Sequence, residues 1–351
     1  PGTRVIVPAG VFLTGTIFVH SNTTLEIAAG ATILGSPRLA DYVPITVRGD
    51  QGDRRPWHLL VVKDAHHVTI CGTGTIDGNG PAFWEPTVQP PDGDGTAITV
   101  VPAREPDPAR AKLSWIRHLD NRRPSPMIEV TNCHDVHIEG IHIMNSAGWC
   151  GHLHDSEHLW LHGVRVTTNL MGPNNDGFDI EACRDVAIND CHVSCCDDAF
   201  VFRPDDRGLE RVTVTNCVIR TRCAALKTGE SAGHIRQLVF SNCVIYESSR
   251  AIALYAGGGT ILEDVAISNI VCDTRSPLLV NRPIHIDLHQ HEPDQPGGVI
   301  RNVAISNMVI RTDGRILMTA QPGRMLENIT LRDIHLIYPT VDDPALCAAM
   351  V

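Results

Sequence analysis

Short stretches in which apolar and polar residues alternate recur along most of the chain. Their common form is (Asn/Asp)-Val-x-Ile-x-(Asn/Gly)-(Cys/Ile), as in DVHIEGI from Asp135 and DVAINDC from Asp185. A period of two places successive side chains on opposite faces, which is the pattern of a half-buried β-strand. We call the residue at the Val position the anchor of its stretch, and the anchors are Val68, Val136, Leu159, Val186, Val212, Leu238, Val265, Val303 and Ile329.

The anchors are spaced at a nearly constant interval, which indicates a repeat. Successive intervals are 68, 23, 27, 26, 26, 27, 38 and 26 residues, and most units contain a second short apolar run, such as AFVF at 199–202. One such unit cannot bury its own apolar face, whereas stacked units can. The sequence therefore predicts an all-β, right-handed parallel β-helix that forms a single domain over residues 1–351. Leucine-rich repeats have a similar period, but the regular leucines and the helix of each unit are missing here.

Two intervals are longer than one coil and predict insertions, at about residues 86–124 and 273–299. The first is rich in Pro and charged residues and contains a helix-like segment, ARAKLSWIRHL at 109–119. We expect it to form a loop over a cleft or an interaction arm. The second contains His285, His289 and His291, which we expect to close one end of a groove.

Composition limits the classes of partner. The net charge of −11 argues against a nucleic-acid partner, which would require a basic stripe. No apolar run reaches the about 18 residues that a membrane span requires, so no membrane partner is expected. The first residues, PGTRVIVPAG, already have the pattern of a turn and a strand. We therefore expect that a targeting segment has been removed and that the protein is secreted or periplasmic, with a cytoplasmic location as the alternative. A monomer and a small homo-oligomer both remain open.

The twelve cysteines do not have the spacing of a zinc site, because no C-x-x-C pair occurs. Cys191, Cys217 and Cys243 instead recur at one place in the repeat. This recurrence favours a buried stack of small side chains over disulfides or metal ligands. We therefore expect no metal and no cofactor.

Three aspartates are the candidate catalytic residues, because the repeat brings them together. Asp197 and Asp198 follow Asp176 by 21 and 22 positions, slightly less than one coil. Neighbouring coils lie about 4.8 Å apart, so we predict that the three carboxyls share one face. Like charges this close raise one another's pKa, which lets one carboxyl remain an acid while another acts as a base. The alternative is that these aspartates only cap turns.

Other polar residues are predicted to lie beside the aspartates. Counted back from the next anchor, Asp176 is ten residues away, and four more residues fall at similar counts: Arg203, Lys227, Glu230 and Tyr255. We expect these to form one polar column that contacts substrate. Arg203 and Lys227 would neutralise a substrate carboxylate or hold the aspartates in place, and a structural ion pair with Glu230 is the alternative.

Trp149 and His152 form a further candidate substrate site. The face of a Trp side chain commonly stacks on a sugar ring, and His152 stands three residues away. We expect both side chains to touch a carbohydrate substrate.

These motifs resemble those of the polygalacturonase-like (pectinase) glycoside hydrolases, family 28, over nearly the whole chain. GTGTIDGNGPAFWE is similar to their G-TIDG-G-WW stretch, and NSAGWCGHLHDSEHLWLHGV to their N-S-P-W-x-x-H segment, with His152 at the His position. GPNNDGFDI resembles N-T-D-G-x-D, and CCDDAFVF resembles the G-D-D-C core. The two aspartate motifs stand 21 residues apart, as in the family.

The resemblance implies a role for each aspartate. Asp197 would be the general acid that protonates the glycosidic oxygen, and Asp176 and Asp198 would hold and deprotonate the attacking water. The reaction would invert the anomeric carbon, for which the carboxyls of an inverting enzyme lie roughly 6.5–9.5 Å apart. The implied substrate is galacturonan or a related pectic chain of the plant cell wall, bound without a metal.

Two motifs of the family are missing. Its G-H-G histidine would fall in RTRCAALKTGES, where Cys223-Ala224-Ala225 stands. Its R-I-K motif, which holds substrate carboxylates, would fall near RAIALYAGG, where Ala253-Leu254-Tyr255 stands. These departures favour an exo-acting or side-chain enzyme for another sugar over an endo-hydrolase of homogalacturonan. The alternatives are a β-helix lyase, epimerase or fructan-type transferase, and a catalytically inactive carbohydrate-binding β-helix.

Overall fold

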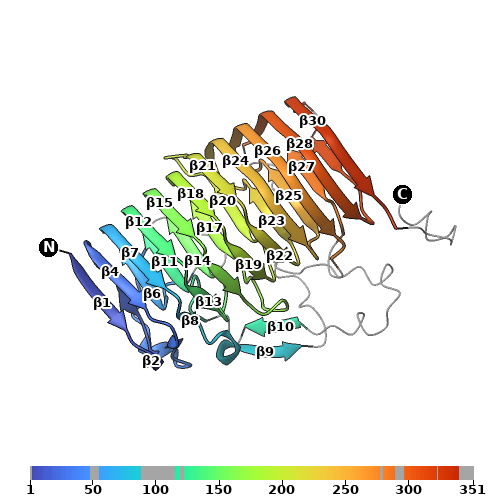
Figure 1. Cartoon of the computed structure of the whole chain (residues 1–351). Helices are drawn as coiled ribbons and strands as arrows, with labels where there is room; N and C mark the ends of the chain where they lie inside the picture. Colours follow the sequence, from blue (N-terminus) through green and yellow to red (C-terminus); the bar gives the residue numbers. More distant parts are fainter. Residues whose placement is uncertain are drawn as a thin grey trace.

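The computed structural model describes residues 2–47, 55–87, 115–118, 122–276, 280–288, 296–321 and 323–339. Successive coils of short strands stack from the N-terminal to the C-terminal end, so that neighbouring coils in space are neighbours in sequence (Figure 1). Apart from the pair β9 and β10, the strands are parallel to their partners, and the architecture is the predicted all-β parallel β-helix. None of the described helices is long and apolar enough to cross a membrane.

Two large sheets form the walls of the described coils. The ten-stranded sheet contains β3 (Ile17–Phe18), β6 (Leu60–Lys63), β11 (Ile128–Thr131), β14 (Gly151–His154), β17 (Phe178–Glu181), β20 (Phe200–Arg203), β23 (Ala224–Thr228), β25 (Arg250–Tyr255), β27 (Ile284–Leu288) and β29 (Leu317–Ala320).

The second sheet has eighteen strands and supplies the remaining sides of each coil. It contains β1 (Thr3–Val7), β2 (Gly10–Thr14), β4 (Thr23–Ile27), β5 (Ala31–Gly35), β7 (His66–Gly72), β8 (Thr75–Asp77), β12 (His134–Glu139), β13 (His142–Met144), β15 (Glu157–His162), β16 (Arg165–Thr167), β18 (Arg184–Asn189), β19 (His192–Cys195), β21 (Leu209–Thr215), β22 (Val218–Thr221), β24 (Gly233–Tyr246), β26 (Thr260–Thr274), β28 (Val299–Thr312) and β30 (Leu326–Ile337). Two short 3₁₀ helices, η1 (Leu39–Asp41) and η2 (Gly80–Phe83), lie in the N-terminal part.

The anchors predicted from the sequence occupy one line of the larger sheet. Val68 pairs with Val136, Val136 with Leu159, and the pairing continues without a shift to Val303 and Ile329. Because a shift of one residue would turn every apolar side chain outward, this register keeps the anchors in the core. The eight anchors from Val68 to Val303 are buried.

The residue before each anchor adopts a left-handed backbone conformation. From His67 to Asn328, all nine such residues have φ between 52° and 62°. Asn and Asp tolerate this region best, and they occupy five of the nine positions. A second left-handed position carries a ladder of asparagine side chains, in which Asn269 donates to Asn242 at 2.9 Å and Asn307 donates to Asn269 at 2.6 Å.

The apolar side chains of all coils meet in one continuous core. Cys191, Cys217 and Cys243 are buried at corresponding positions, as the repeat predicts. The eleven cysteines among the described residues are all free thiols.

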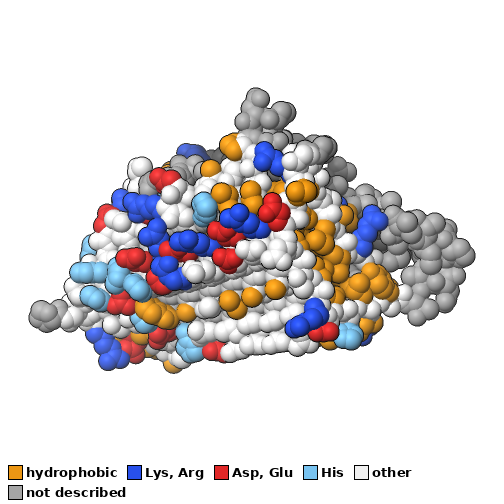
Figure 2. Space-filling model, turned by 90° about the horizontal axis from the view of Figure 1, so that it is seen from above, with side chains coloured by type: hydrophobic (Ala, Val, Ile, Leu, Met, Phe, Trp, Pro, Cys, Tyr) orange, Lys and Arg blue, Asp and Glu red, His pale blue; other side chains and the backbone are white. Residues whose placement is uncertain are grey.

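Outside the core, a column of alternating charge crosses the larger sheet. It runs through Glu157, Arg184, Glu210, Arg236, Glu263, Arg301 and Glu327, each in register with the next. Arg236 donates to Glu210 at 2.7 Å, and Arg301 donates to Glu263 at 2.8 Å. Figure 2 shows such interleaved basic and acidic side chains on the face seen from above. Opposite charges on directly facing residues stabilise the pairing of the coils.

The predicted insertions require two corrections. Residues 115–118 of the expected helix form strand β10 (Trp115–His118), which pairs antiparallel with β9 (Trp84–Thr87), so backbone pairing overrides the helical pattern there. Residues 88–114 and 119–121 lie outside the described residues. The second segment, 273–299, is only partly an insertion, because it contains β27, which pairs with β25 and β29 in a regular coil. His289 and His291 lie outside the described residues.

Candidate active site

The three candidate aspartates lie at one bend of the helix, on two adjacent coils. Asp176 precedes β17 and Asp198 precedes β20, and Phe178 and Phe200 of these strands are in register. The backbone N–H of Gly177 donates to the carbonyl oxygen of Asp198 at 2.9 Å. A step of 22 residues therefore returns the chain to the same bend one coil further on.

Asp198 is held as a carboxylate by an ion pair and a backbone donor. Lys227 Nζ lies 3.2 Å from Oδ2 of Asp198, and the N–H of Ala224 donates to Oδ1 at 2.9 Å. Burial alone would raise the pKa of Asp198, but Lys227 and the donors around it bring that pKa below its usual value. Lys227 Nζ also lies 3.2 Å from Oε2 of Glu230, so the predicted ion pair with Glu230 and the predicted support of an aspartate are both present.

The pKa values of Asp197 and Asp176 are shifted in the opposite direction from that of Asp198. Burial and the neighbouring charge of Asp198 raise the pKa of Asp197 to about 7. Burial and then Asp197 raise the pKa of Asp176 well above its usual value. Oδ1 of Asp176 is buried without a hydrogen-bond partner. The bend thus combines one ionised carboxylate with two carboxyls that retain protons more readily, which is the division that acid–base catalysis requires.

A second charged pair lies beside the aspartates. Arg203 Nη1 donates to Oδ1 of Asp179 at 2.6 Å, and its guanidinium carbon lies 4.9 Å from the ring centroid of Trp149. Burial raises the pKa of Asp179 to about 6, although Arg203 opposes this shift. Trp149 is only 4% exposed. The ring that the sequence predicts to stack on a sugar therefore stacks against Arg203.

His152 does not reach the surface, which corrects its expected contact with substrate. The side chain is fully buried, with Nδ1 at 3.0 Å from Oε1 of Glu129 and Nε2 at 3.3 Å from Oε2 of Glu181. Burial alone would raise the pKa of Glu181, but the hydrogen bond and charge of His152 lower it overall. Because Glu129 and Glu181 belong to the two neighbouring coils, His152 links three coils.

The predicted polar column is in fact two columns. Arg203 is in register with Glu181, whereas Lys227 is in register with Val201, two residues earlier in that strand. The reason is the length of one bend. Phe178 lies eight residues before its anchor, Val186, but Phe200 lies twelve before Val212, so the bend after β20 has four additional residues. Counting residues back from the anchors assumes bends of equal length. It therefore wrongly places Arg203 and Tyr255 at the same position of the coil as Asp176.

Tyr255 lies further along the ten-stranded sheet. Its hydroxyl is 2.9 Å from Nδ1 of His285, and Nε2 of His285 is 3.5 Å from Oδ2 of Asp287. Tyr255 is in register with Asp287, and His285 is 4% exposed. These contacts give Tyr255 a partner on the next coil, and its contact with substrate stays a prediction.

Two further residues at the bend were not predicted from the sequence as site residues. Cys223 stands where the family histidine was expected, and Arg250 Nη1 lies 3.9 Å from its sulfur. Asp197, Cys223 and Arg250 each stand fifteen residues before an anchor, so the same counting along the repeat could have found them. Among the described residues, only Asp197, Asp198 and Cys223 form a group with metal-ligating atoms all within 4.8 Å of one another.

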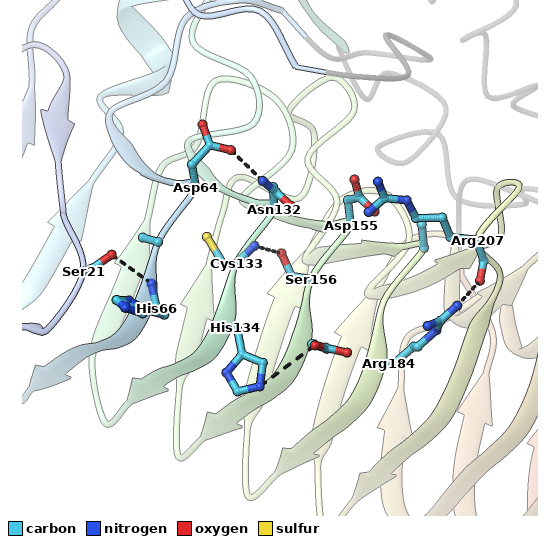
Figure 3. Close-up of a pocket in the computed structure, with 13 residues that line it drawn as sticks. Ser21, Asp64, His66, Asn132, Cys133, His134, Asp155, Ser156, Arg184 and Arg207 are labelled. Atoms are coloured by element: carbon cyan, nitrogen blue, oxygen red, sulfur yellow. Dashed lines mark hydrogen bonds and ion pairs between the residues drawn. The ribbon is translucent and has the colours of Figure 1, made fainter.

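A separate polar hollow lies at the opposite edge of the ten-stranded sheet. It has a volume of ≈ 470 Å³ and is lined by residues that follow β6, β11 and β14, including Asp64, Asn132 and Asp155 (Figure 3). Asn132 donates to Asp64 at 2.7 Å, and Arg207 pairs with Asp155. The aspartates of the bend instead precede their strands, so this hollow is not part of the candidate active site.

Most glycoside hydrolases use a pair of Asp or Glu carboxyls that flank the bond they cleave, and the bend provides such carboxyls. The family model described as Glycosyl hydrolases family 28 matches residues 110–338, more than half of the chain. The chain therefore belongs to glycosyl hydrolase family 28 and is a polygalacturonase-like glycosidase.

Individual relatives are distant. A probable polygalacturonase of Vitis vinifera is 23% identical over 373 residues, which cover 99% of this chain and 70% of the grape protein. An exopolygalacturonase of Rhizopus delemar, rpg15, is 23% identical over 65% of this chain and 51% of its own length. This chain thus spans about half the length of the Rhizopus protein.

Solved structures show the same fold. The hyperthermoactive exopolygalacturonase of Thermotoga maritima matches 95% of this chain and 80% of its own with a TM-score of 0.69 and 21% identity. The endo-xylogalacturonan hydrolase of Aspergillus tubingensis matches 96% of this chain and 85% of its own with a TM-score of 0.66 and 13% identity. At these identities the likeness is one of fold.

Proposed function

We propose that the protein hydrolyses glycosidic bonds of pectic chains with inversion, with Asp197 as the general acid and Asp198 as the base that activates water. The observation that carries this proposal is the contrast between two consecutive residues. The pKa of Asp197 is raised to about 7, while Lys227 and the N–H of Ala224 stabilise the ionised form of Asp198. A proton donor and a proton acceptor are thus available together at neutral pH.

Asp176 has a different part in this proposal. Its raised pKa keeps Asp176 protonated at a pH where Asp198 is ionised, so Asp176 positions the attacking water and Asp198 removes the proton. The unpartnered Oδ1 atom of Asp176 is the group available for such a contact. The resemblance implies that Asp176 and Asp198 together hold and deprotonate the attacking water, and this proposal assigns one of the two parts to each.

The proposed substrate is a galacturonate-containing chain, cleaved from one end. Relatives named exopolygalacturonases and an exopolygalacturonase fold match support this choice. Arg250 near the aspartates, together with Lys227, would provide positive charge close to a uronate carboxylate. Because pectic chains occur outside the cell, we propose a secreted or periplasmic enzyme.

The test is Asp197→Asn on galacturonate oligomers, with product anomers followed by NMR. Loss of a general acid typically costs 10²–10⁴-fold in rate, so the variant should lose at least about 10²-fold in kcat while its circular dichroism stays unchanged. Wild-type product should appear first as the inverted anomer. A variant with near-wild-type kcat would remove Asp197 from the reaction, and an unsaturated product absorbing in the ultraviolet would identify a lyase.

A further inference from the structure

The thiol of Cys223 lies at the same bend as the aspartates. Together, the thiol and the carboxyls form a set of possible metal ligands. The ligating atoms of Asp197, Asp198 and Cys223 all lie within 4.8 Å of one another. Zn²⁺ and Cd²⁺ prefer thiolate and combine it with carboxylate ligands, whereas Mg²⁺ and Ca²⁺ prefer oxygen alone. A sulfur among carboxylates therefore selects soft or borderline dications.

A fourth donor is available from the adjacent coil. Asp176 is 4% exposed, and its Oδ1 atom is buried without a hydrogen-bond partner. The N–H of Asp197 donates to the carbonyl oxygen of Asn175 at 3.3 Å, and the N–H of Gly177 donates to that of Asp198 at 2.9 Å, so Asp176 stands beside the pair on the adjacent coil. Leaving a buried carboxylate oxygen without a hydrogen bond costs free energy, and a bound cation would satisfy that oxygen. Asp176 lies outside the group whose ligating atoms are all within 4.8 Å of one another, so its side chain would turn toward Asp197, Asp198 and Cys223 to complete the four-coordinate shell that zinc adopts in proteins.

The backbone of Cys223 is fixed before any ion binds. Its carbonyl oxygen accepts hydrogen bonds from the N–H of Ser249 at 3.1 Å and from the N–H of Arg250 at 3.0 Å, and its own N–H donates to Oγ1 of Thr221 at 3.1 Å. Cys223 and Asp197 are partly exposed, so an ion can reach them from solvent. The donors therefore sit on a rigid bend with access from outside.

The charges at the bend also suit a dication. When ionised, the side chains of Asp176, Asp197, Asp198, Cys223 and Glu230 would carry more negative charge than Lys227 and Arg250 carry positive charge. A dication that displaces the protons of the carboxyls and the thiol would therefore meet an excess of negative charge.

We propose that Asp176, Asp197, Asp198 and Cys223 form a binding site for a thiophilic dication such as Zn²⁺ or Cd²⁺, and that its occupation blocks hydrolysis. The blocking part rests on the proposed function, because the ion would occupy the carboxyls that transfer protons. The binding part does not depend on any activity.

Binding is tested by titrating the reduced, chelator-treated protein with Cd²⁺ and recording the ultraviolet charge-transfer band of the cadmium–thiolate bond. Wild type should develop the band with one equivalent of Cd²⁺. Cys223→Ser should lose the band and weaken binding by at least about 100-fold, since even residues behind the metal ligands are worth 10–100-fold in affinity. Cys71→Ser is the matched control, because Cys71 is the other partly exposed cysteine among the described residues. Its band should remain.

A wild-type protein without the band, or a band that survives in Cys223→Ser, would overturn the site. Asp176→Asn provides a second variant, which should weaken Cd²⁺ binding while retaining the thiolate band. Inhibition is measured as the ratio of rates with and without Zn²⁺ in wild type and Cys71→Ser, and both should be inhibited at the concentration that saturates binding. Full activity of the saturated enzyme would overturn the blocking part alone.

Discussion

Arg203 and Asp179 form an ion pair of 2.6 Å between adjacent coils, beside the bend that holds the three aspartates. The two side chains are 14% and 1% exposed, so neither charge is well solvated. Removing one partner of a buried pair leaves the other charge uncompensated, which typically costs about 3–5 kcal/mol. Arg203→Ala should therefore lower the free energy of unfolding by about 3 kcal/mol, measured by urea denaturation.

Arg301 provides the comparison for this prediction. It pairs with Glu263 on the outer face and is 45% exposed, and exposed pairs contribute about 0–1 kcal/mol. Arg301→Ala should thus change the free energy of unfolding by less than about 1 kcal/mol. Equal effects of the two substitutions would contradict the claim that burial distinguishes the two pairs.

The pKa of Asp197, raised to about 7, predicts a pH dependence of activity in a chelating buffer. A general acid acts only when protonated, so kcat/KM should fall as the pH rises through about 7. The acid limb should lie at low pH, because the pKa of Asp198 is below its usual value. A profile still rising above pH 8 would argue against Asp197 as the acid.

The same group predicts a pH dependence of stability. The folded state holds the proton of Asp197 up to about pH 7, whereas the unfolded chain releases it near the ordinary aspartate value, so stability falls as the pH rises between these two values. Asp197→Asn removes this loss and should be more stable than wild type above pH 7. Thermal unfolding at pH 5 and pH 8 measures the difference, which should be larger at pH 8.

Lys227 sets the charge state of Asp198. Lys227→Met removes the ammonium group 3.2 Å from Oδ2, so the pKa of Asp198 should rise and the acid limb of the kcat/KM profile should move to higher pH. Glu230→Gln is the control, because it removes the second partner of Lys227 but keeps the Lys227–Asp198 contact. An acid limb that stays in place in Lys227→Met would mean that another group holds Asp198 ionised.

The asparagine ladder predicts a stability effect far from the active site. Asn269 has a φ of 58° and joins Asn242 to Asn307, so Asn269→Ala loses two hydrogen bonds and places Ala in a left-handed conformation. The expected loss is about 2 kcal/mol, from about 1 kcal/mol of backbone strain and a comparable amount for the hydrogen bonds. Asn269→Gly keeps the backbone unstrained and should lose less. Urea denaturation of both variants gives the comparison.

The sequence is sufficient to predict those features that depend on the repeat. The line of anchors from Val68 to Ile329 follows from the period of two and the nearly constant interval, because register in a half-buried strand is set by the apolar pattern. The meeting of Asp176 with Asp198 follows from the length of one coil.

Features that depend on the bends could not be predicted. The four additional residues after β20 have no apolar pattern, so nothing in them shows that Arg203 faces Glu181 rather than Asp176. The burial of His152 depends on Glu129 and Glu181, which lie one coil before and one coil after it. Such partners are known only once the register across both bends is known.

The unequal bends also bear on how such a scaffold can change. Each coil is fastened to its neighbours along the strands, so extra residues at a bend project sideways and leave the stacking distance as it was. Two adjacent coils here differ by four residues at one corner while Phe178 and Phe200 remain directly paired. The bend after β20 can therefore change in length, while Asp176 and Asp198, which precede their strands at the opposite edge of the sheet, keep their mutual positions.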